Sequence, residues 1–156
     1  MEWAQFANLE PDLAAEGEKR FDVSGLALVG SIRKDGTPRI SPTEPLIHNG
    51  RLYLGMMWRS TKALDLLRDP RVLVHNTVSD RMGADGEFKV RGHALVIDDG
   101  AERAGYAEAL KAKIDWAPTG DEWHLFAVDI EHITLQWFEK EERHTRTWAE
   151  PAPNDS

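Results

Sequence analysis

The stretch from Gly25 to Met57 constrains the fold most, because it contains three extended segments joined only by tight turns. Apolar residues recur at every second position at its start, as Leu26 and Leu28 show, which is the spacing of a strand with one more buried face. The turn signals are Asp35-Gly36 and Asn49-Gly50, and the latter pair is the strongest short hairpin signal in a sequence. Strands joined by such short turns are antiparallel neighbours.

The rest of the chain adds more strands than helices. We expect helices over residues 2–21, 60–69 and 101–114, and strands over residues 25–32, 37–48, 51–57, 72–78, 87–97, 124–130, 133–138 and, as a short last one, 145–148. Three prolines between residues 37 and 48 make that segment an edge or irregular strand, because proline cannot donate to a ladder. Regular alternation of strand and crossover helix is missing. The pattern therefore predicts a mainly β fold, a six- to seven-stranded antiparallel barrel with a short inserted helix and flanking helices.

Length and charge narrow the class of protein. A chain of 156 residues suits one domain, which we place at residues 1–150, with a disordered tail over 151–156. The formal net charge of −8 argues against general nucleic-acid binding, because such a surface repels phosphates. No apolar run approaches the roughly 20 residues that cross a bilayer, and no secretory signal is visible, so we expect a cytoplasmic protein without a membrane partner.

The sequence contains few side-chain patterns that could catalyse a reaction without a cofactor. The absence of cysteine excludes thiolate chemistry and thiolate metal sites, and the six histidines lack metal-ligand spacing, so we expect no metal site. Nucleotide-binding glycine loops and hydrolase motifs are also missing. If this protein is an enzyme, a cofactor carries the chemistry.

The start of the short helix over residues 60–69 is the best candidate for binding that cofactor. Arg59, Ser60, Thr61 and Lys62 place two cations and two hydroxyls where a helix presents unpaired N–H groups. Ser60 is the expected N-cap, Pro70 ends the helix, and Leu64 and Leu67 are expected to face inward. These residues predict a phosphate site, and the alternative is an ordinary capped helix whose cations are solvated.

The order of these features resembles the flavin-binding split β-barrel superfamily that includes pyridoxamine 5'-phosphate oxidase. The resemblance rests on the Asp-Gly turn, Pro-Arg-x-Ser-Pro in the next strand, the Asn-Gly hairpin and Ser-x-Lys-Ala-x-x-Leu-x-x-Asp-Pro-Arg-Val, and it covers roughly residues 25–97. It implies flavin mononucleotide (FMN) as cofactor, held between the two subunits of a homodimer. Met57, Trp58, Trp137 and Trp148 suit either that interface or a core.

The resemblance also implies which residues bind the cofactor. The phosphate would lie at Ser60, Thr61 and Lys62, where Thr61 replaces an arginine of the family and Arg59 is the nearby cation. The flavin ring would lie along Arg39, Ile40 and Ser41, the ribityl chain near Gly55 and Met56, and Glu87 matches a glutamine that touches the ring. The family's residues for pyridoxamine phosphate have no match: Glu44 replaces a basic residue, and Arg143-His144 near the end departs from Arg-x-His. We therefore expect no activity on pyridoxamine phosphate.

Four functions remain open at this point. The first is an FMN-dependent oxidoreductase that passes hydride to or from a small-molecule substrate. The second is a deazaflavin-dependent reductase of the same fold, whose cofactor has an acidic tail that Arg33, Lys34 and Arg39 would meet. The third is a non-catalytic flavin or haem binder, with His48, His75 or His93 as the axial ligand of the haem. The fourth is a structural homodimer with an empty groove.

Overall fold

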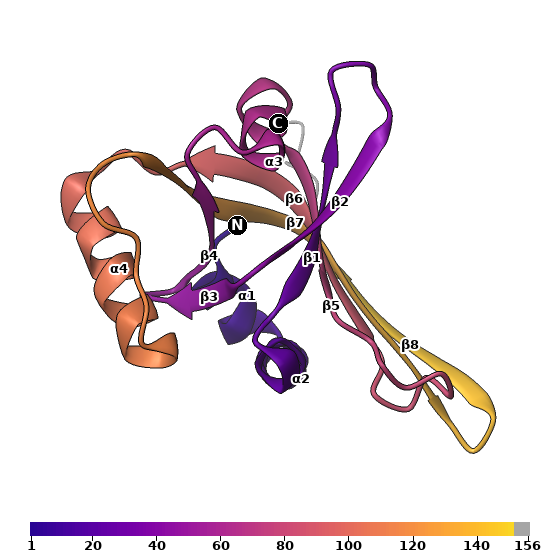
Figure 1. Cartoon of the computed structure of the whole chain (residues 1–156). Coiled ribbons are helices and arrows are strands. Elements are labelled where there is room, and N and C mark those ends of the chain that lie inside the picture. Colours follow the sequence, from indigo (N-terminus) through magenta and orange to yellow (C-terminus); the bar gives the residue numbers. More distant parts are fainter. Residues whose placement is uncertain (152–156) are drawn as a thin grey trace, which may run out of the picture.

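The computed structural model describes residues 1–151, so the five last residues of the predicted disordered tail, 152–156, lie outside the described part. Helices and strands alternate irregularly along the chain (Figure 1). The elements are α1 (Trp3–Leu9), α2 (Pro11–Ser24), β1 (Ala27–Ile32), β2 (Pro38–Thr43), β3 (Pro45–His48), β4 (Arg51–Met57), α3 (Thr61–Arg68), β5 (Arg71–Asn76), β6 (Glu87–Val96), α4 (Gly100–Ile114), β7 (Trp123–Glu139) and β8 (Glu142–Ala149).

The strands form one antiparallel eight-stranded sheet, as the short turns predicted. Its order is β2-β1-β5-β6-β7-β4-β3, with β8 added on β7. Strands β2 and β3 are consecutive in the chain, separated only by Glu44, yet they lie at opposite ends of this order. The sheet therefore curls until its two edges are bridged by this one bent segment (Figure 1) without closing by hydrogen bonds, which is a split barrel.

The proline-rich segment over residues 37–48, which we expected to be one strand, forms two strands. Pro42 and Pro45 flank the bend at Thr43 and Glu44, and both strands lie at sheet edges, where missing N–H groups cost no ladder bond. The edge position predicted from the prolines is thus confirmed, whereas the prediction of one continuous strand over residues 37–48 was wrong.

The extent of strand β7 also differs from the prediction. We expected separate strands over 124–130 and 133–138, whereas Trp123–Glu139 is one strand of 17 residues. The pairing with β6 shifts between Arg91 and Gly92, so that Glu131 is an extra residue in β7. This β-bulge bends the strand without ending it. Gly92 is required there, because a Cβ atom on it would lie 1.9 Å from the carbonyl oxygen of Asp129.

The N-terminal helix predicted over residues 2–21 is in fact two helices. The break lies at Glu10, because the proline that follows disfavours helical geometry in the residue before it, and Pro11 becomes the first residue of α2. Both helices pack against the main core, to which they contribute Trp3, Phe6, Leu13 and Phe21. The rings of Trp3 and Phe21 both meet Phe88 of β6 edge to face.

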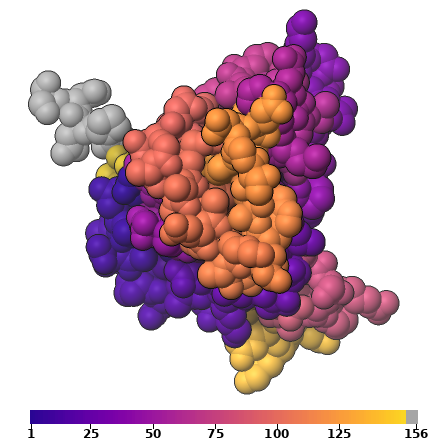
Figure 2. All heavy atoms as spheres, turned by 60° about the vertical axis from the view of Figure 1, so that its left-hand side comes forward, coloured from indigo at the N-terminus to yellow at the C-terminus, as the bar shows by residue number. Residues whose placement is uncertain are grey.

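A second, smaller core lies under α4. Tyr106 and Leu110 of this helix pack on Tyr53, Trp123 and Leu125 of strands β4 and β7. Figure 2 shows α4 and the loop after it forming one continuous face of the molecule. No helix within residues 1–151 combines the length and the apolar character that crossing a membrane requires.

Helix α3 begins after Ser60 and ends before Pro70 as predicted, but its buried face differs from the expected one. Leu64 and Leu67 are 38% and 46% exposed, and the buried residues are Ala63, Asp65 and Leu66. The cause is Asp65, which binds groups on β1 and β2 and so sets the rotation of the helix. Successive helical residues are 100° apart, and Leu64 and Leu67 are therefore turned toward solvent.

Candidate functional site

Three of the predicted cofactor-binding segments meet at one corner of the barrel, where β4 ends and α3 begins. The Lys62 ammonium donates a hydrogen bond to the carbonyl oxygen of Pro42 in β2 at 2.5 Å. The Thr43 hydroxyl donates to the carbonyl oxygen of Gly55 in β4 at 3.1 Å. These contacts bring the start of α3 beside both strands. We call Arg59, Ser60, Thr61 and Lys62 the cradle.

The turn that enters the cradle has an unusual backbone. Arg59 adopts a left-handed conformation with φ of 52°, a region that non-glycine residues rarely occupy. Its N–H donates to Nε2 of His124 at 3.1 Å, and the Trp58 ring stacks on the same imidazole at 4.7 Å. Burial, and then the charge of Arg103, lowers the pKa of His124 below its usual value. A neutral His124 can accept this hydrogen bond and hold the turn in place.

Ser60 supplies the observation that bears most directly on a ligand. It occupies the N-cap position of α3, yet its side chain makes no capping hydrogen bond. Its hydroxyl oxygen is buried and has no hydrogen-bond partner among residues 1–151. A buried hydroxyl without a partner costs free energy, so a polar ligand atom placed beside Ser60 would gain a hydrogen bond that the chain itself does not supply. The donor set here, a hydroxyl, a lysine and the first N–H groups of a helix, fits a phosphate.

The two cations of the cradle are placed differently. The side chain of Arg59 is exposed, whereas that of Lys62 is half-buried. Burial lowers the pKa of Lys62 below its usual range, and the nearby carboxylate of Glu44 opposes that shift. The ammonium has three donors and Pro42 takes one, so two remain for an anion.

Arg39 is on β2 as predicted, but its side chain is already paired. Its Nε donates to Asp65 Oδ2 at 2.6 Å, and Asp65 also accepts from the Ser31 hydroxyl at 3.0 Å and from Arg68 at 3.2 Å. Burial by itself raises the pKa of Asp65, but these hydrogen bonds, that from Arg39 foremost, outweigh it and hold the pKa below its usual value. Arg39 therefore locks α3 onto the sheet.

The other predicted residues are spread across the barrel. Ile40 is 72% exposed, Ser41 is half-buried, and the Met56 side chain is in the main core. Glu87 starts β6, which is separated from β2 by β1 and β5. There it pairs with Lys89, which lowers the pKa of the Glu87 carboxyl, and lies 3.7 Å from His75. The structure groups the cradle with Gly55 and β2, and it leaves Glu87 apart.

The three histidines considered as haem ligands do not converge. His75 contacts the carbonyl oxygen of Asn76 at 2.5 Å, His93 Nδ1 pairs with Glu131 at 2.8 Å, and His48 ends β3 at the other edge of the sheet. Among residues 1–151, no group of three or more acidic or histidine side chains is arranged to hold a metal ion.

Sequence reasoning missed two residues that shape this corner. Asp65 could have been found from the sequence, because it is a charged residue between leucines that were expected to face inward. Nothing in the sequence pointed to His124, because its contact with Arg59 depends on the long-range pairing of Met56 with His124 between β4 and β7.

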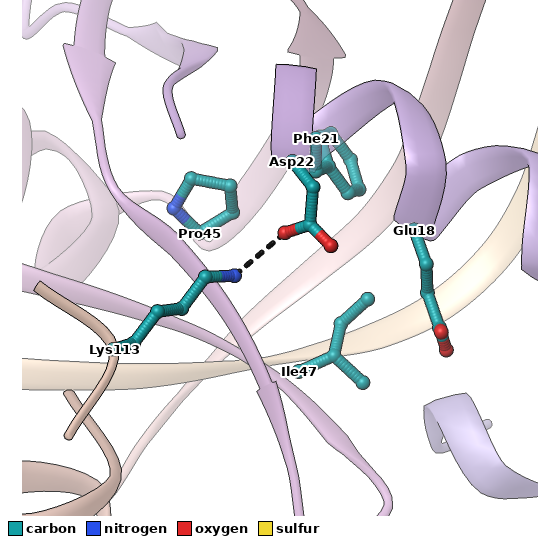
Figure 3. Close-up of a pocket in the computed structure, with 6 residues that line it drawn as sticks. All are labelled: Glu18, Phe21, Asp22, Pro45, Ile47 and Lys113. Atoms are coloured by element: carbon teal, nitrogen blue, oxygen red, sulfur yellow. Dashed lines mark hydrogen bonds and ion pairs between the residues drawn. The ribbon is translucent and has the colours of Figure 1, made fainter. Parts of the chain in front are cut away.

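A small cavity of about 190 Å³ lies elsewhere, between α2, β3 and α4. Figure 3 shows that Lys113, its only cation, is paired with Asp22, and Glu18 also lines the cavity. The Lys113–Asp22 distance is 2.7 Å. A cavity whose cation is neutralised and which contains a further carboxylate does not suit a phosphate, so the cradle is the better candidate for a phosphate site.

Comparison with known proteins identifies the fold. No protein-family model and no curated protein sequence matches the chain. Among solved structures, a haem-binding protein of Mycobacterium smegmatis aligns with a TM-score of 0.61 at 17% identity, over 85% of this chain and 57% of that one. This chain thus spans little more than half of that protein's length.

Two proteins of Clostridium acetobutylicum align over more of their own length. One is related to general stress protein 26, of the pyridoxinephosphate oxidase family, with a TM-score of 0.63 and 14% identity over 85% of this chain and 92% of that one. The other is a NimC/NimA family protein, with a TM-score of 0.65 and 14% identity over 86% and 91%. The chain has the split β-barrel fold of the pyridoxamine 5'-phosphate oxidase-like proteins. Proteins with this fold include a haem-binding protein and a member of the pyridoxinephosphate oxidase family, so the fold alone does not determine what this chain binds.

Proposed function

We propose that this protein binds FMN, with the cofactor's phosphate in the cradle, and passes hydride between the flavin and a small organic molecule. The observation that supports this most is the buried Ser60 hydroxyl, which lacks a partner beside Lys62 at the first turn of α3. A phosphate oxygen would satisfy that hydroxyl and would be drawn there by the nearby cations.

The flavin would supply the redox chemistry, and the protein would position it. Lys62 and Ser60 would bind the phosphate, while the exposed Arg59 side chain would add a second cation. The bonds from Lys62 to Pro42 and from Thr43 to Gly55 hold the strands at fixed places beside the cradle. Backbone groups of Arg39 to Ser41, at a sheet edge, would meet the ring.

We further propose that the working unit is a homodimer in the cytoplasm, with the cofactor at the subunit interface. Met57 and Trp58, directly before the cradle, are 79% and 50% exposed in the single chain. Trp137 and Trp148 instead pack against the main core, which accounts for them without a partner. Sedimentation equilibrium of Met57→Glu tests the interface. We expect weaker dimerisation than for wild type, and an unchanged dimer would refute this placement of the interface.

The cofactor is tested first by the absorption spectrum of the purified protein, because flavin, deazaflavin and haem have different visible bands. The site is tested by the double variant Arg59→Ala with Lys62→Ala in FMN titrations. Each charge-assisted contact contributes about 1.5–3 kcal/mol, and Arg59 is exposed, so we expect affinity to fall by about tenfold or more. Unchanged FMN affinity would refute the cradle as the phosphate site.

The double variant Arg33→Ala with Lys34→Ala is the matched control. These two cations lie in the exposed turn between β1 and β2, so FMN affinity should stay at the wild-type value. A deazaflavin with an acidic tail would be weakened by this change, which separates the two cofactors. A haem-type spectrum would favour the second candidate, a haem binder, which the similarity to the mycobacterial protein supports.

A further inference from the structure

His124 connects strand β7 to the turn that enters the cradle. In that turn, Met57 ends β4, and the N–H of Ser60 donates to the carbonyl oxygen of Met57 at 3.1 Å. Arg59 lies between them with its left-handed φ of 52°. Residues other than glycine adopt this conformation at a cost in free energy, so it persists only where neighbouring contacts enforce it.

Two contacts with His124 enforce it. The N–H of Arg59 donates to Nε2 at 3.1 Å, and the Trp58 ring lies 4.7 Å from the imidazole, with the two planes 11° apart. His124 is itself held in place by the pairing of β7 with β4, where it lies opposite Met56. The imidazole therefore fixes the two residues that precede Ser60, and with them the place where α3 begins.

The hydrogen bond from Arg59 needs a neutral imidazole. Nε2 of His124 accepts it only when the ring proton is on Nδ1, whereas a protonated imidazole has an N–H group at both nitrogens. Protonation would set the Nε2 proton against the N–H of Arg59 and release the turn. It would also add a positive charge that attracts anions. The two consequences of protonation thus affect phosphate binding in opposite directions.

The surroundings of His124 favour the neutral form. Burial, and then the charge of Arg103 on α4, lowers its pKa, and Asp98 opposes the shift. Arg103 is fixed nearby, because it donates to the carbonyl oxygen of Trp123 at 3.0 Å and its guanidinium lies 3.9 Å from the centre of that residue's ring. The third charged neighbour is Arg59, whose side chain is exposed. The other neighbours from β4, the turn and β7 are uncharged, namely Met56, Trp58 and Phe126.

We propose that His124 is a positioning residue of the cradle, and that the cradle binds a phosphate more tightly while this imidazole is neutral than when it is protonated. The proposal rests on the function proposed above, because it concerns the same phosphate. Release of the turn outweighs the added charge, since the turn directly precedes the phosphate donors of Ser60 and α3, whereas an imidazolium acts from a neighbouring strand and is screened by salt.

The direction of the pH dependence follows from the pKa of His124. Because this pKa lies below the ordinary value of 6.5, the imidazole is neutral above that pH, and phosphate affinity should not depend on His124 there. Below it, the imidazole takes up a proton and affinity should fall. Loss of one hydrogen bond corresponds to a decrease of about fivefold.

FMN titrations from about pH 8 to about pH 5 compare wild type with His124→Gln, whose amide oxygen can accept from Arg59 but does not titrate. The phosphate of FMN itself titrates near pH ~6, equally for both proteins, so the ratio of their affinities isolates His124. We expect the affinity of wild type relative to the variant to be constant above pH ~6.5 and to fall by about fivefold at the acid end.

His132→Gln is the matched control. His132 lies on the same strand, and burial, and then the charge of Arg91, lowers its pKa as well, but it pairs with β6 rather than with the cradle's strand. The pH dependence of FMN affinity in this variant should equal that of wild type.

NMR of the cofactor-free protein tests the contact without any ligand. The amide resonance of Arg59 should shift with the same midpoint as the imidazole of His124, and it should not shift over this range in His124→Gln. An Arg59 amide that ignores the titration of His124 would overturn the proposal.

The two experiments separate this inference from the proposed function. If wild type binds FMN at neutral pH but its affinity relative to His124→Gln stays constant or rises in acid, the inference is wrong and the cradle stands. If wild type does not bind FMN at neutral pH, the proposed function fails and this role of His124 in phosphate binding fails with it, whatever the Arg59 amide shows.

Discussion

Replacing Asp65 by alanine should destabilise this protein more than a typical substitution does. The carboxylate is buried and joins α3 to two strands by accepting from Ser31 and Arg39, at 3.0 and 2.6 Å. The alanine variant leaves the Ser31 hydroxyl and the Arg39 guanidinium without their acceptor. Both groups are largely withdrawn from water, at 2% exposure for Ser31 and 24% for the Arg39 side chain.

The magnitude follows from that exposure. Removing one partner of a buried ion pair costs about 3–5 kcal/mol, because the remaining charge is left uncompensated. The Arg39 side chain is not fully buried and can regain part of its hydration, so we expect a loss of about 2–4 kcal/mol in the free energy of unfolding. For a domain of this size that corresponds to a fall in Tm of roughly 5–15 °C. Asp65→Asn keeps one acceptor oxygen and should lose about half as much.

Urea denaturation of wild type, Asp65→Ala, Arg39→Ala and the double variant measures the coupling directly. The double variant should be more stable than the sum of the single losses predicts, because removing both partners leaves no unpaired charge. A loss below about 1 kcal/mol in Asp65→Ala at neutral pH would refute the reasoning.

The same pair makes a pH prediction. The pKa of Asp65 is lower in the folded protein than in the unfolded chain, so the carboxylate stabilises the fold above pH ~4. This contribution is lost as the pH falls below that value through the folded-state pKa. The stability difference between wild type and Asp65→Ala should therefore be constant from about pH 6 to 8 and shrink under acid.

Two further substitutions test the sheet. Gly92→Ala should lower the free energy of unfolding by about 3 kcal/mol, because the added Cβ atom would lie 1.9 Å from the carbonyl oxygen of Asp129. Gly100→Ala is the control: its Cβ atom would have open space, so this variant should be as stable as wild type or more stable. Denaturant titration measures both. Asn76→Asp should cost about 2–3 kcal/mol at neutral pH, because Asn76 donates its amide to the carbonyl oxygens of Thr77 and Gly86 and a buried carboxylate cannot. We expect the difference in Tm between wild type and Asn76→Asp to be smaller at pH 4.5 than at pH 7, because the introduced carboxyl takes up a proton at the lower pH. The same difference at both pH values would contradict the buried position of this side chain.

Features that depend on a few neighbouring residues could be predicted from the sequence. Asn49 and Gly50 both have positive φ, at 45° and 79°, which is the hairpin geometry that this pair favours. Pro11 begins a helix and Pro70 ends another because of the backbone chemistry of proline, and Ser60 is at the N-cap position as expected, although its hydroxyl makes no capping hydrogen bond. Antiparallel pairing followed from the short turns.

The tertiary structure alone decided which distant segments meet and how they are rotated. The β-bulge at Glu131 exists only because β6 and β7 pair with a shift at Gly92, and the split of β2 from β3 exists only because the sheet curls. The same holds for the cradle. Its residue types are visible in the sequence, but the unused Ser60 hydroxyl, the contact of Arg59 with His124 and the pairing of Arg39 with Asp65 depend on strand register. Local chemistry determines turns and helix ends, whereas side-chain partners depend on long-range packing that no short stretch of sequence encodes.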